Sequence, residues 1–241
     1  MSSREQEGNL MEIKICEMFH SIQGEGILEG IPSVLVRMVG CNLSCDWCDT
    51  KDILQNGKYE TYTEEELLER LSEYPCKRII ITGGEPLLFD QLENLIDILR
   101  KHGYHVTIET NGTIRTDVHC DLVSISPKLS NSIPQTIKDE QELKLYNQKR
   151  INIDAIRWFM DNNNYQLKFV ASNRQEDFDE IRGILNEIGE YDEERVMVMP
   201  HADSIECLEE IQAEVARLCI ENKFRYANRL QLQIWRNENE R

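Results

Sequence analysis

Three cysteines crowd into one short segment near the N-terminus. Cys41, Cys45 and Cys48 lie in the sequence CNLSCDWC, with the spacing C-x3-C-x2-C. Thiolates are the protein ligands that suit zinc and iron–sulfur clusters. A structural zinc site is closed by four ligands, usually from two separated pairs, whereas this segment supplies three. His20 or a more distant residue would have to complete such a site.

A four-iron cluster held by three thiolates leaves one iron without a protein ligand. That iron is an open binding position, comparable to the open position of a catalytic metal. We therefore interpret the segment as an iron–sulfur site, and two alternatives stay open: structural zinc, or three cysteines without any ligand. The five other cysteines are scattered and are interpreted as packed or surface residues: Cys16, Cys76, Cys120, Cys207 and Cys219.

Short apolar runs alternate with longer amphipathic stretches along the chain, which is typical of β/α units. Runs such as RIIIT and VMVM are almost wholly apolar, as in parallel strands that are buried on both faces. The predicted strands are Ile13–Met18, Ser33–Val39, Arg78–Thr82, His105–Glu109, Leu122–Ser126, Gln166–Val170 and Arg195–Met199. The predicted helices are Thr63 to Glu73, Gln91–Lys101, Asp154–Asn162, Glu176–Ile188 and Ser204–Asn222, and Pro127–Tyr146 is expected to be a loop with a short helix.

This alternation predicts an α/β fold with a parallel sheet, because β/α/β crossovers are right-handed. A closed eight-stranded barrel needs about 250 residues and eight units. About six units are present, so we expect an incomplete, TIM-like β/α barrel of about six parallel strands in a single domain. The polar residues 1–10 are expected to form a disordered tail, and residues 11–241 the core domain.

Unusual sequences follow the ends of successive predicted strands. They are CNLSCDWC, GGEP, ETNG, SPK and Pro200-His201, in chain order. In a parallel α/β barrel, the loops at the carboxyl ends of the strands open on one rim, where active sites form. Turns collect glycine and proline for ordinary conformational reasons, but that does not explain three cysteines in one of them. We therefore expect these segments to share one rim.

The composition excludes some classes of partner. The chain of 241 residues has 44 acidic and 27 basic side chains, which gives a formal net charge of −17. A surface of this charge repels the phosphates of nucleic acids and anionic membranes. No apolar stretch approaches the ~20 residues that span a bilayer, and the N-terminus lacks the apolar region of a secretory signal. We expect a soluble, cytoplasmic protein.

The order of two motifs carries a resemblance. A C-x3-C-x2-C segment after an early strand, with GGEP after the next strand, resembles the radical S-adenosylmethionine superfamily. The resemblance implies that Cys41, Cys45 and Cys48 ligate a [4Fe–4S] cluster whose free iron is chelated by the cofactor's amino and carboxylate groups. One electron from the reduced cluster would cleave the cofactor into methionine and a 5′-deoxyadenosyl radical.

The resemblance also implies contacts to S-adenosylmethionine. An aromatic side chain beside the last cysteine can pack on adenine, and the glycines of GGEP allow backbone carbonyls to approach the ammonium group. SPK offers a hydroxyl and a cation to the ribose or the carboxylate. The implied cofactor-binding residues are Trp47, Cys48, Asp49, Gly84, Ser126, Pro127 and Lys128.

Further motifs narrow the resemblance. The chain is similar to the 7-carboxy-7-deazaguanine synthase family in several motifs taken together: IQGEG at residues 22–26, Arg37, CDT at residues 48–50, ETNG and SISPK. This similarity extends from Glu12 to about Pro200. Members rearrange 6-carboxy-5,6,7,8-tetrahydropterin to 7-carboxy-7-deazaguanine with loss of ammonia, on the route to queuosine-type 7-deazapurines. The implied substrate-binding residues are Ile22, Gln23, Gly24, Glu25, Arg37, Thr82 and Glu109, of which Glu25 and Glu109 could instead brace loops. Thr50 corresponds to the family's Mg²⁺ ligand.

The C-terminal segment departs from the family. Members commonly end with P-Q-x-H near the substrate, whereas this chain reads RYANRLQLQIW from Arg225. We expect Asn228 and Gln231 to take the corresponding places, although neither titrates near neutral pH as histidine does. The alternation of apolar residues at 230, 232 and 234 predicts a final strand. His201, on the predicted rim, is open to either a packing or a site role.

The resemblance implies a homodimer and an electron donor such as a flavodoxin or a ferredoxin. Two other functions remain as alternatives. A glycyl-radical enzyme activase shares the three cysteines and GGEP, although QGEG and Arg37 speak against it. A non-catalytic binding module with structural zinc is the alternative outside the enzymes.

Overall fold

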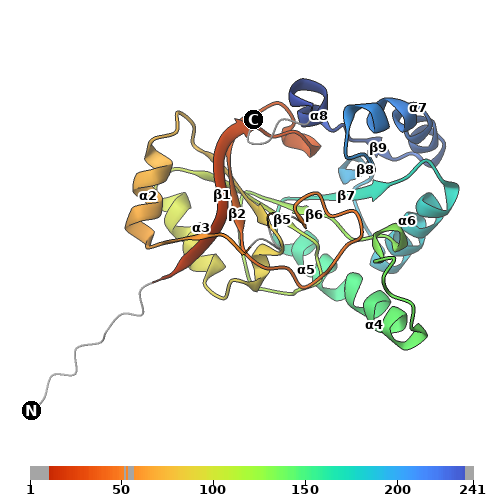
Figure 1. Ribbon diagram of the computed structural model, residues 1–241, viewed down its shortest axis with the longest axis horizontal. Coiled ribbons are helices and arrows are strands. Elements are labelled where there is room, and N and C mark those ends of the chain that lie inside the picture. Colours follow the sequence, from red (N-terminus) through yellow and green to blue (C-terminus); the bar gives the residue numbers. More distant parts are fainter. Residues whose placement is uncertain (1–10, 52, 54–56, 237–241) are drawn as a thin grey trace, which may run out of the picture.

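The structure is a computed structural model that describes residues 11–51, 53 and 57–236. One sheet organises this part of the chain (Figure 1), with the strand order β3-β1-β2-β4-β5-β6-β7-β8-β9. The strands are β1 Ile13–Ile22, β2 Pro32–Met38, β3 Glu60–Tyr62, β4 Arg78–Gly83, β5 His105–Thr110, β6 Leu122–Ile125, β7 Tyr165–Ala171, β8 Val196–Pro200 and β9 Arg225–Tyr226. The tail expected at residues 1–10 lies outside the described residues.

The sheet is parallel over most of its width. Each pair of neighbours from β2 to β9 is parallel, and β1 runs antiparallel to both β2 and β3. The order begins at β3 and ends at β9, so the sheet does not close on itself. This confirms the expectation of an incomplete α/β barrel, with β9 as a two-residue addition to six longer parallel strands.

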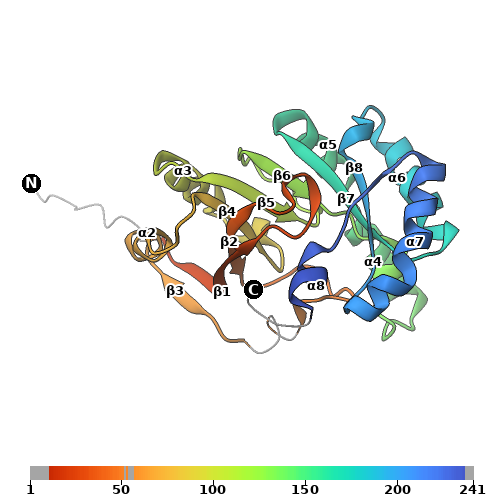
Figure 2. The ribbon, with the colours of Figure 1, turned by 90° about the horizontal axis from the view of Figure 1, so that it is seen from above.

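The helices lie between strands along the described chain, except the last one, which follows β9. They are α2 Glu64–Ser72, α3 Leu92–Lys101, α4 Glu140–Arg150, α5 Ile153–Asn162, α6 Gln175–Ile188, α7 Ile205–Asn222 and α8 Leu230–Trp235. Figure 2 shows α3, α5, α6 and α7 along the outer side of the sheet, with α8 apart from them. The segment 127–146 is the predicted loop, with a 3-10 turn at Ser130–Ser132, but its helix α4 extends to Arg150.

Local sequence explains most helix boundaries. Thr63 accepts a hydrogen bond from the backbone of Glu66, whose side chain accepts one from Thr63 in return, so the predicted capping box starts α2. Gly103 ends α3 with a φ of 79°, a conformation that glycine adopts at no steric cost. The apolar strands β4 and β8 are buried along nearly their whole length, as expected for strands covered on both faces.

The predicted final strand is wrong. Residues 230–235 form the short helix α8, and the pairing with β8 ends at Tyr226. In this segment Leu232 is buried whereas Ile234 is 46 % exposed, so the alternating apolar residues do not share one buried face. Three alternating positions are too few to fix a strand, and a hydrogen bond from Leu230 N to Gly24 O turns the chain away from the sheet.

Candidate active site

One cavity of about 770 Å³ opens at the carboxyl ends of the parallel strands. Residues of CNLSCDWC, GGEP, ETNG and SPK all line it, together with the end of β1, so four of the five predicted rim segments share this cavity. The fifth segment does not, because neither Pro200 nor His201 is among the lining residues. The predicted site residues that line it are Ile22, Gln23, Gly24, Glu25, Arg37, Cys41, Cys45, Trp47, Cys48, Asp49, Thr50, Thr82, Gly84, Glu109, Ser126 and Lys128. Pro127 is not among the lining residues.

The three thiols are free and lie at the cavity. Two of the sulfurs have a polar neighbour here: Leu43 N lies 3.4 Å from Cys41 Sγ, and the Tyr146 hydroxyl on α4 lies 3.8 Å from Cys45 Sγ. Hydrogen bonds to sulfur support thiolates that ligate iron. Three free thiols that face a cavity large enough for further ligands therefore fit an iron–sulfur cluster.

A closed zinc site is not formed by these thiols. Within the described ranges, no three His, Cys, Asp or Glu side chains converge closely enough to hold a single metal ion. Thr50, predicted to ligate Mg²⁺, is buried beside the cluster segment, with its Oγ1 3.4 Å from Cys48 Sγ.

Gly84 allows the motif loops to pack closely. A side chain at Gly84 would place its Cβ 1.7 Å from the carbonyl oxygen of Gly40, which directly precedes Cys41. Glu85, only 1 % exposed, accepts hydrogen bonds from Thr110 Oγ1 and Asn111 N, each at 2.7 Å. Burial raises the pKa of the Glu85 carboxyl. These contacts join GGEP, ETNG and the cysteine loop into one rigid wall.

Trp47, which lies in the cysteine loop, is held by side chains from other segments. Its Nε1 donates to Asn131 Oδ1 at 3.1 Å, and its ring lies 5.1 Å from the ring of His201, centroid to centroid. Lys128 Nζ lies 5.6 Å from the Trp47 ring centroid and donates to Ser126 Oγ at 2.8 Å. Burial lowers the pKa of His201. His201 thus packs against Trp47 and supports an aromatic platform.

A buried network of charges occupies the side of the cavity next to β1. Glu109 accepts hydrogen bonds from Gln23 Nε2 at 3.1 Å and from Thr82 Oγ1 at 3.0 Å. Lys168 of β7 lies 4.0 Å from Glu109 Oε1 and donates to Glu25. Burial alone would raise the pKa of Glu25, but the nearby cations, led by Lys168, lower it to about 2. Four predicted substrate-binding residues thus share one network.

Arg37 is oriented by a carboxylate on the neighbouring strand. Its Nε donates to Glu17 Oε2 at 2.8 Å, and the two residues are partners in the β1–β2 register. Both line the cavity. Because this contact uses Nε, the two terminal nitrogens of Arg37 have no hydrogen bond to any described residue and are available to an anion.

Sequence reasoning missed Glu17, Lys168 and Arg229 among the cavity residues. A lysine in the apolar strand LKFV was a usable signal, because a buried charge needs a partner. Of the two C-terminal candidates, Gln231 lines the cavity, whereas Asn228 donates to Gln233 Oε1 at 2.9 Å and is not among the lining residues. Arg229 enters the cavity in its place, a choice that no sequence pattern indicated.

Comparison with known proteins decides the family. Residues 35–162 match the Radical SAM superfamily model. The chain is 36 % identical over 233 residues to 7-carboxy-7-deazaguanine synthase of Halobacterium salinarum, covering 92 % of this chain and 90 % of that protein. The chain belongs to the 7-carboxy-7-deazaguanine synthase family. A second family relative, from Rhodopirellula baltica, is 35 % identical over 224 residues, covering 92 % of this chain and 86 % of that protein.

Solved structures agree with the assignment to the 7-carboxy-7-deazaguanine synthase family. QueE from Escherichia coli superposes with a TM-score of 0.66 at 25 % identity, covering 91 % of this chain and 94 % of that one. A structure of TYW1, with a TM-score of 0.52, 14 % identity and coverage of 79 % and 72 %, shares the fold alone. Neither the activase nor the zinc module is favoured by these matches.

Family membership sets the cofactors, which are a [4Fe–4S] cluster, S-adenosylmethionine and Mg²⁺. The free thiols at the cavity are consistent with this set. In the described part of the chain, none of the helices combines the length and apolar character needed to cross a membrane.

Proposed function

We propose that this chain converts 6-carboxy-5,6,7,8-tetrahydropterin to 7-carboxy-7-deazaguanine and ammonia, within a core domain of residues 11–241. The supporting observation is that the carboxylate-binding candidate Arg37 and the polar network around Glu109 face the same cavity as three free thiols. The substrate carries a carboxylate and a polar pterin edge, so this arrangement provides a matching partner for each.

Arg37 binds the substrate carboxylate in this proposal. A guanidinium can grip a carboxylate through two parallel N–H bonds, and Glu17 fixes the plane of this one through Nε. The partly buried setting strengthens the contact, because the side chains of Arg37 and Glu17 are only 14 % and 19 % exposed. Glu17 is thus a positioning residue for Arg37.

The pterin edge meets the network of Gln23, Thr82 and Glu109. Ring N–H and amino groups are donors, so a carboxylate and an amide oxygen are suitable partners. The Ile22–Gly24 backbone lies next to this network and completes the substrate contacts. Glu25 makes its contacts to Lys168 and Gln231, so we assign it to hold the network in place rather than to touch the pterin.

We assign the contacts to the cluster and to S-adenosylmethionine from the residues that lie around the three thiols. Cys41, Cys45 and Cys48 ligate the cluster, and Trp47, Asp49, Gly84, Ser126 and Lys128 contact S-adenosylmethionine, whereas Pro127 does not line the cavity and is left out of this set. The cluster and S-adenosylmethionine, when bound, supply the one-electron radical chemistry that starts the rearrangement. Thr50 supplies a hydroxyl oxygen to Mg²⁺, and substrate and water supply the other oxygens, as this hard cation prefers.

Three further proposals concern the location of the enzyme, its electron donor and its oligomeric state. All eight cysteines are free, as is usual for proteins of a reducing compartment, and this supports a cytoplasmic location. A flavodoxin or a ferredoxin would deliver the electron to the cluster. We also propose a homodimer, on the family resemblance alone.

Anaerobic incubation of the reconstituted, reduced protein with S-adenosylmethionine and 6-carboxytetrahydropterin tests the function. We expect 7-carboxy-7-deazaguanine and ammonia in equal amounts. Release of 5′-deoxyadenosine without any deazaguanine would reject this substrate and retain the radical chemistry. Iron analysis gives an independent result, because stoichiometric zinc without iron or sulfide would contradict the cluster.

A substitution tests the role of Arg37. Arg37→Lys keeps the charge but loses the two-pronged geometry, so KM for the pterin should rise by about tenfold or more. Arg182→Lys is the matched control, because Arg182 makes an exposed ion pair with Asp179 on α6. An unchanged KM in Arg37→Lys would remove Arg37 from the carboxylate site.

A further inference from the structure

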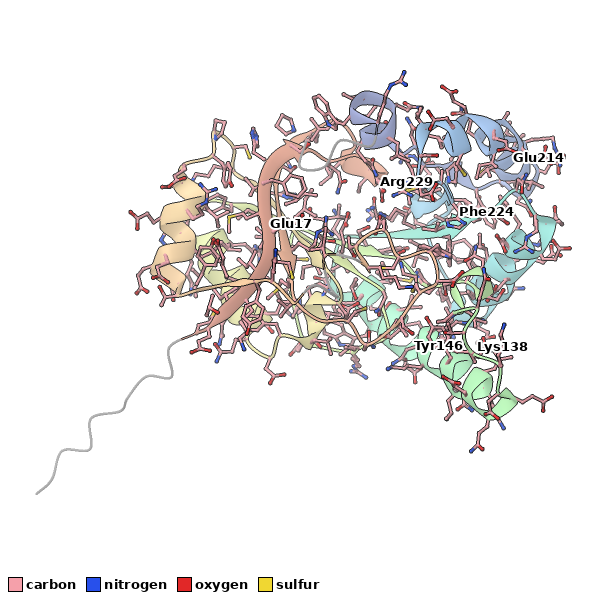
Figure 3. All side chains as sticks on the ribbon, in the orientation of Figure 1. Glu17, Lys138, Tyr146, Glu214, Phe224 and Arg229 are labelled. Carbon is pink, nitrogen blue, oxygen red and sulfur yellow. The ribbon has the colours of Figure 1, made fainter. Side chains whose placement is uncertain are left out.

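Arg229 bridges three segments that are far apart in the sequence. Its Nη1 donates to the carbonyl oxygen of Ala202, its Nη2 donates to Asp49 Oδ2 at 3.2 Å, and its Nε lies 3.5 Å from Glu25 Oε1. The residue is 8 % exposed and lines the cavity. Figure 3 labels it beside the end of β1 and below α8. It belongs to the segment in which this chain departs from P-Q-x-H.

The two carboxylates that Arg229 contacts belong to different halves of the cavity. Asp49 directly follows the cluster cysteine Cys48, on the side assigned to S-adenosylmethionine. Glu25 continues the Ile22–Gly24 segment and contacts Lys168, on the side assigned to the pterin. A planar guanidinium has five N–H groups in a fixed fork, so one arginine can hold both carboxylates and a carbonyl oxygen at once. An ammonium group on a flexible stem cannot reproduce that geometry.

The contact between Arg229 and Glu25 is an ion pair without a hydrogen bond. Nε of Arg229 is buried and has no hydrogen-bond partner among the described residues, although Glu25 is close enough for an ion pair. Gln231, two residues later, donates to Glu25 at 2.7 Å, and its own Oε1 is also buried without a partner. Buried polar groups without partners are costly, so a state that satisfies them is favoured.

We infer that Arg229 is a positioning residue that couples the cofactor half of the cavity to the pterin half. This inference rests on the proposed function. The ligand that binds first orders the carboxylate on its side of the cavity, Asp49 or Glu25. Through Arg229 it also orders the loop that carries the second of these carboxylates. The second ligand then meets a loop that is already ordered and binds more tightly. Coupling of this kind is reciprocal, so each ligand strengthens the binding of the other by the same factor.

Equilibrium binding to the holoenzyme measures the coupling without turnover. The anaerobically reconstituted, unreduced enzyme is dialysed against S-adenosylmethionine, with and without saturating 6-carboxytetrahydropterin. We expect the pterin to lower the Kd for S-adenosylmethionine by about fivefold or more in the unaltered chain. Arg229→Gln should remove the effect, so that the ratio of the two Kd values falls to about 1. The control Arg217→Gln should keep it, because Arg217 contacts Glu214 and Glu221 on the exposed face of α7.

Two further variants separate coupling from a folding defect. Asp49→Asn removes one arm of the bridge and leaves Arg229 in place, and it should also abolish the coupling. Arg229→Lys keeps the charge but not the fork of N–H groups, and it should show less than half of the coupling factor measured for the unaltered chain. Absence of coupling in the unaltered chain, or full coupling in a folded Arg229→Gln enzyme, would overturn the inference. If the unaltered enzyme makes deazaguanine and still shows either result, the proposed function stands and only the coupling fails.

Discussion

Lys168 of β7 donates a hydrogen bond to the carboxylate of Glu25, which lies 143 residues earlier in the chain. Both side chains are nearly buried, at 7 % and 13 % exposure. Burial alone would lower the pKa of Lys168, but the carboxylates of Glu25 and Glu109 outweigh it and raise the pKa above its ordinary value. The pair therefore places a permanent cation within the part of the cavity assigned to the pterin.

Removal of the Lys168 cation should destabilise the protein strongly. Lys168→Met leaves Glu109 without its cation and Glu25 with Arg229 alone, and loss of one partner of a buried ion pair costs about 3–5 kcal/mol. Urea unfolding of the apoprotein measures this free energy. The double variant Lys168→Met/Glu25→Gln should recover part of the loss, because one unpaired charge is removed. Arg217→Met breaks only exposed ion pairs, so it should leave the free energy of unfolding almost unchanged. Equal effects of Lys168→Met and Arg217→Met would contradict the role of this pair.

The charge state of Glu25 should make stability depend on acid pH. Its pKa in the folded protein is lowered from 4.5 to about 2. A lowered carboxyl pKa stabilises the fold fully above pH 4.5, and this contribution is lost as the pH falls from 4.5 towards 2. Glu25→Gln removes that titration. As the pH falls, the unfolding free energy of the variant should therefore decrease less steeply than that of the unaltered chain, and the two slopes should differ by up to about 1.4 kcal/mol per pH unit. Urea unfolding between pH 5 and pH 3 tests this, and parallel curves for the two proteins would refute it.

The close approach of two loops should make Gly84 intolerant of a side chain. Gly84→Ala would drive a methyl group into the carbonyl oxygen of Gly40, 1.7 Å from the ideal Cβ position. The displaced cysteine loop should hold less cluster, so iron and sulfide per chain after reconstitution should fall severalfold. Gly183→Ala is the control, because the Cβ at this position in α6 meets no atom within 4 Å. That variant should keep its iron, and a full iron content in both would show that the loop can shift.

Thr50 can be tested through magnesium. Thr50→Ala removes the hydroxyl that we assign to Mg²⁺, so stimulation of turnover by Mg²⁺ should fall by about tenfold, as for the loss of one hydrogen bond or ligand to a charged group. Thr50→Ser keeps the hydroxyl and should keep the stimulation. Because Thr50 Oγ1 also lies 3.4 Å from Cys48 Sγ, iron content is measured in both variants to confirm an intact cluster. An unchanged Mg²⁺ response in Thr50→Ala would remove Thr50 from the metal site.

The cluster segment could be identified from sequence because its ligands are local. Cys41, Cys45 and Cys48 fall within eight residues, and spacing alone confines such thiols to one loop. The parallel sheet was equally accessible, since apolar strands such as β4 and β8 are recognised by their composition. From those two facts the shared rim follows, because loops after parallel strands open on the same side.

The partners inside the cavity were decided only by the tertiary structure. Glu25 meets Gln231 across 206 residues of sequence, and Arg229 meets Asp49 across 180. No local period encodes such pairs, because each depends on how the strands are ordered and on where the C-terminal segment turns. The same limit explains the wrong final strand. An alternation over five residues suits a strand, but the contacts of the Arg229 region with the Glu25 loop fold it as a helix. Sequence thus determined the chemistry of the site, and the fold determined which charges face one another within it.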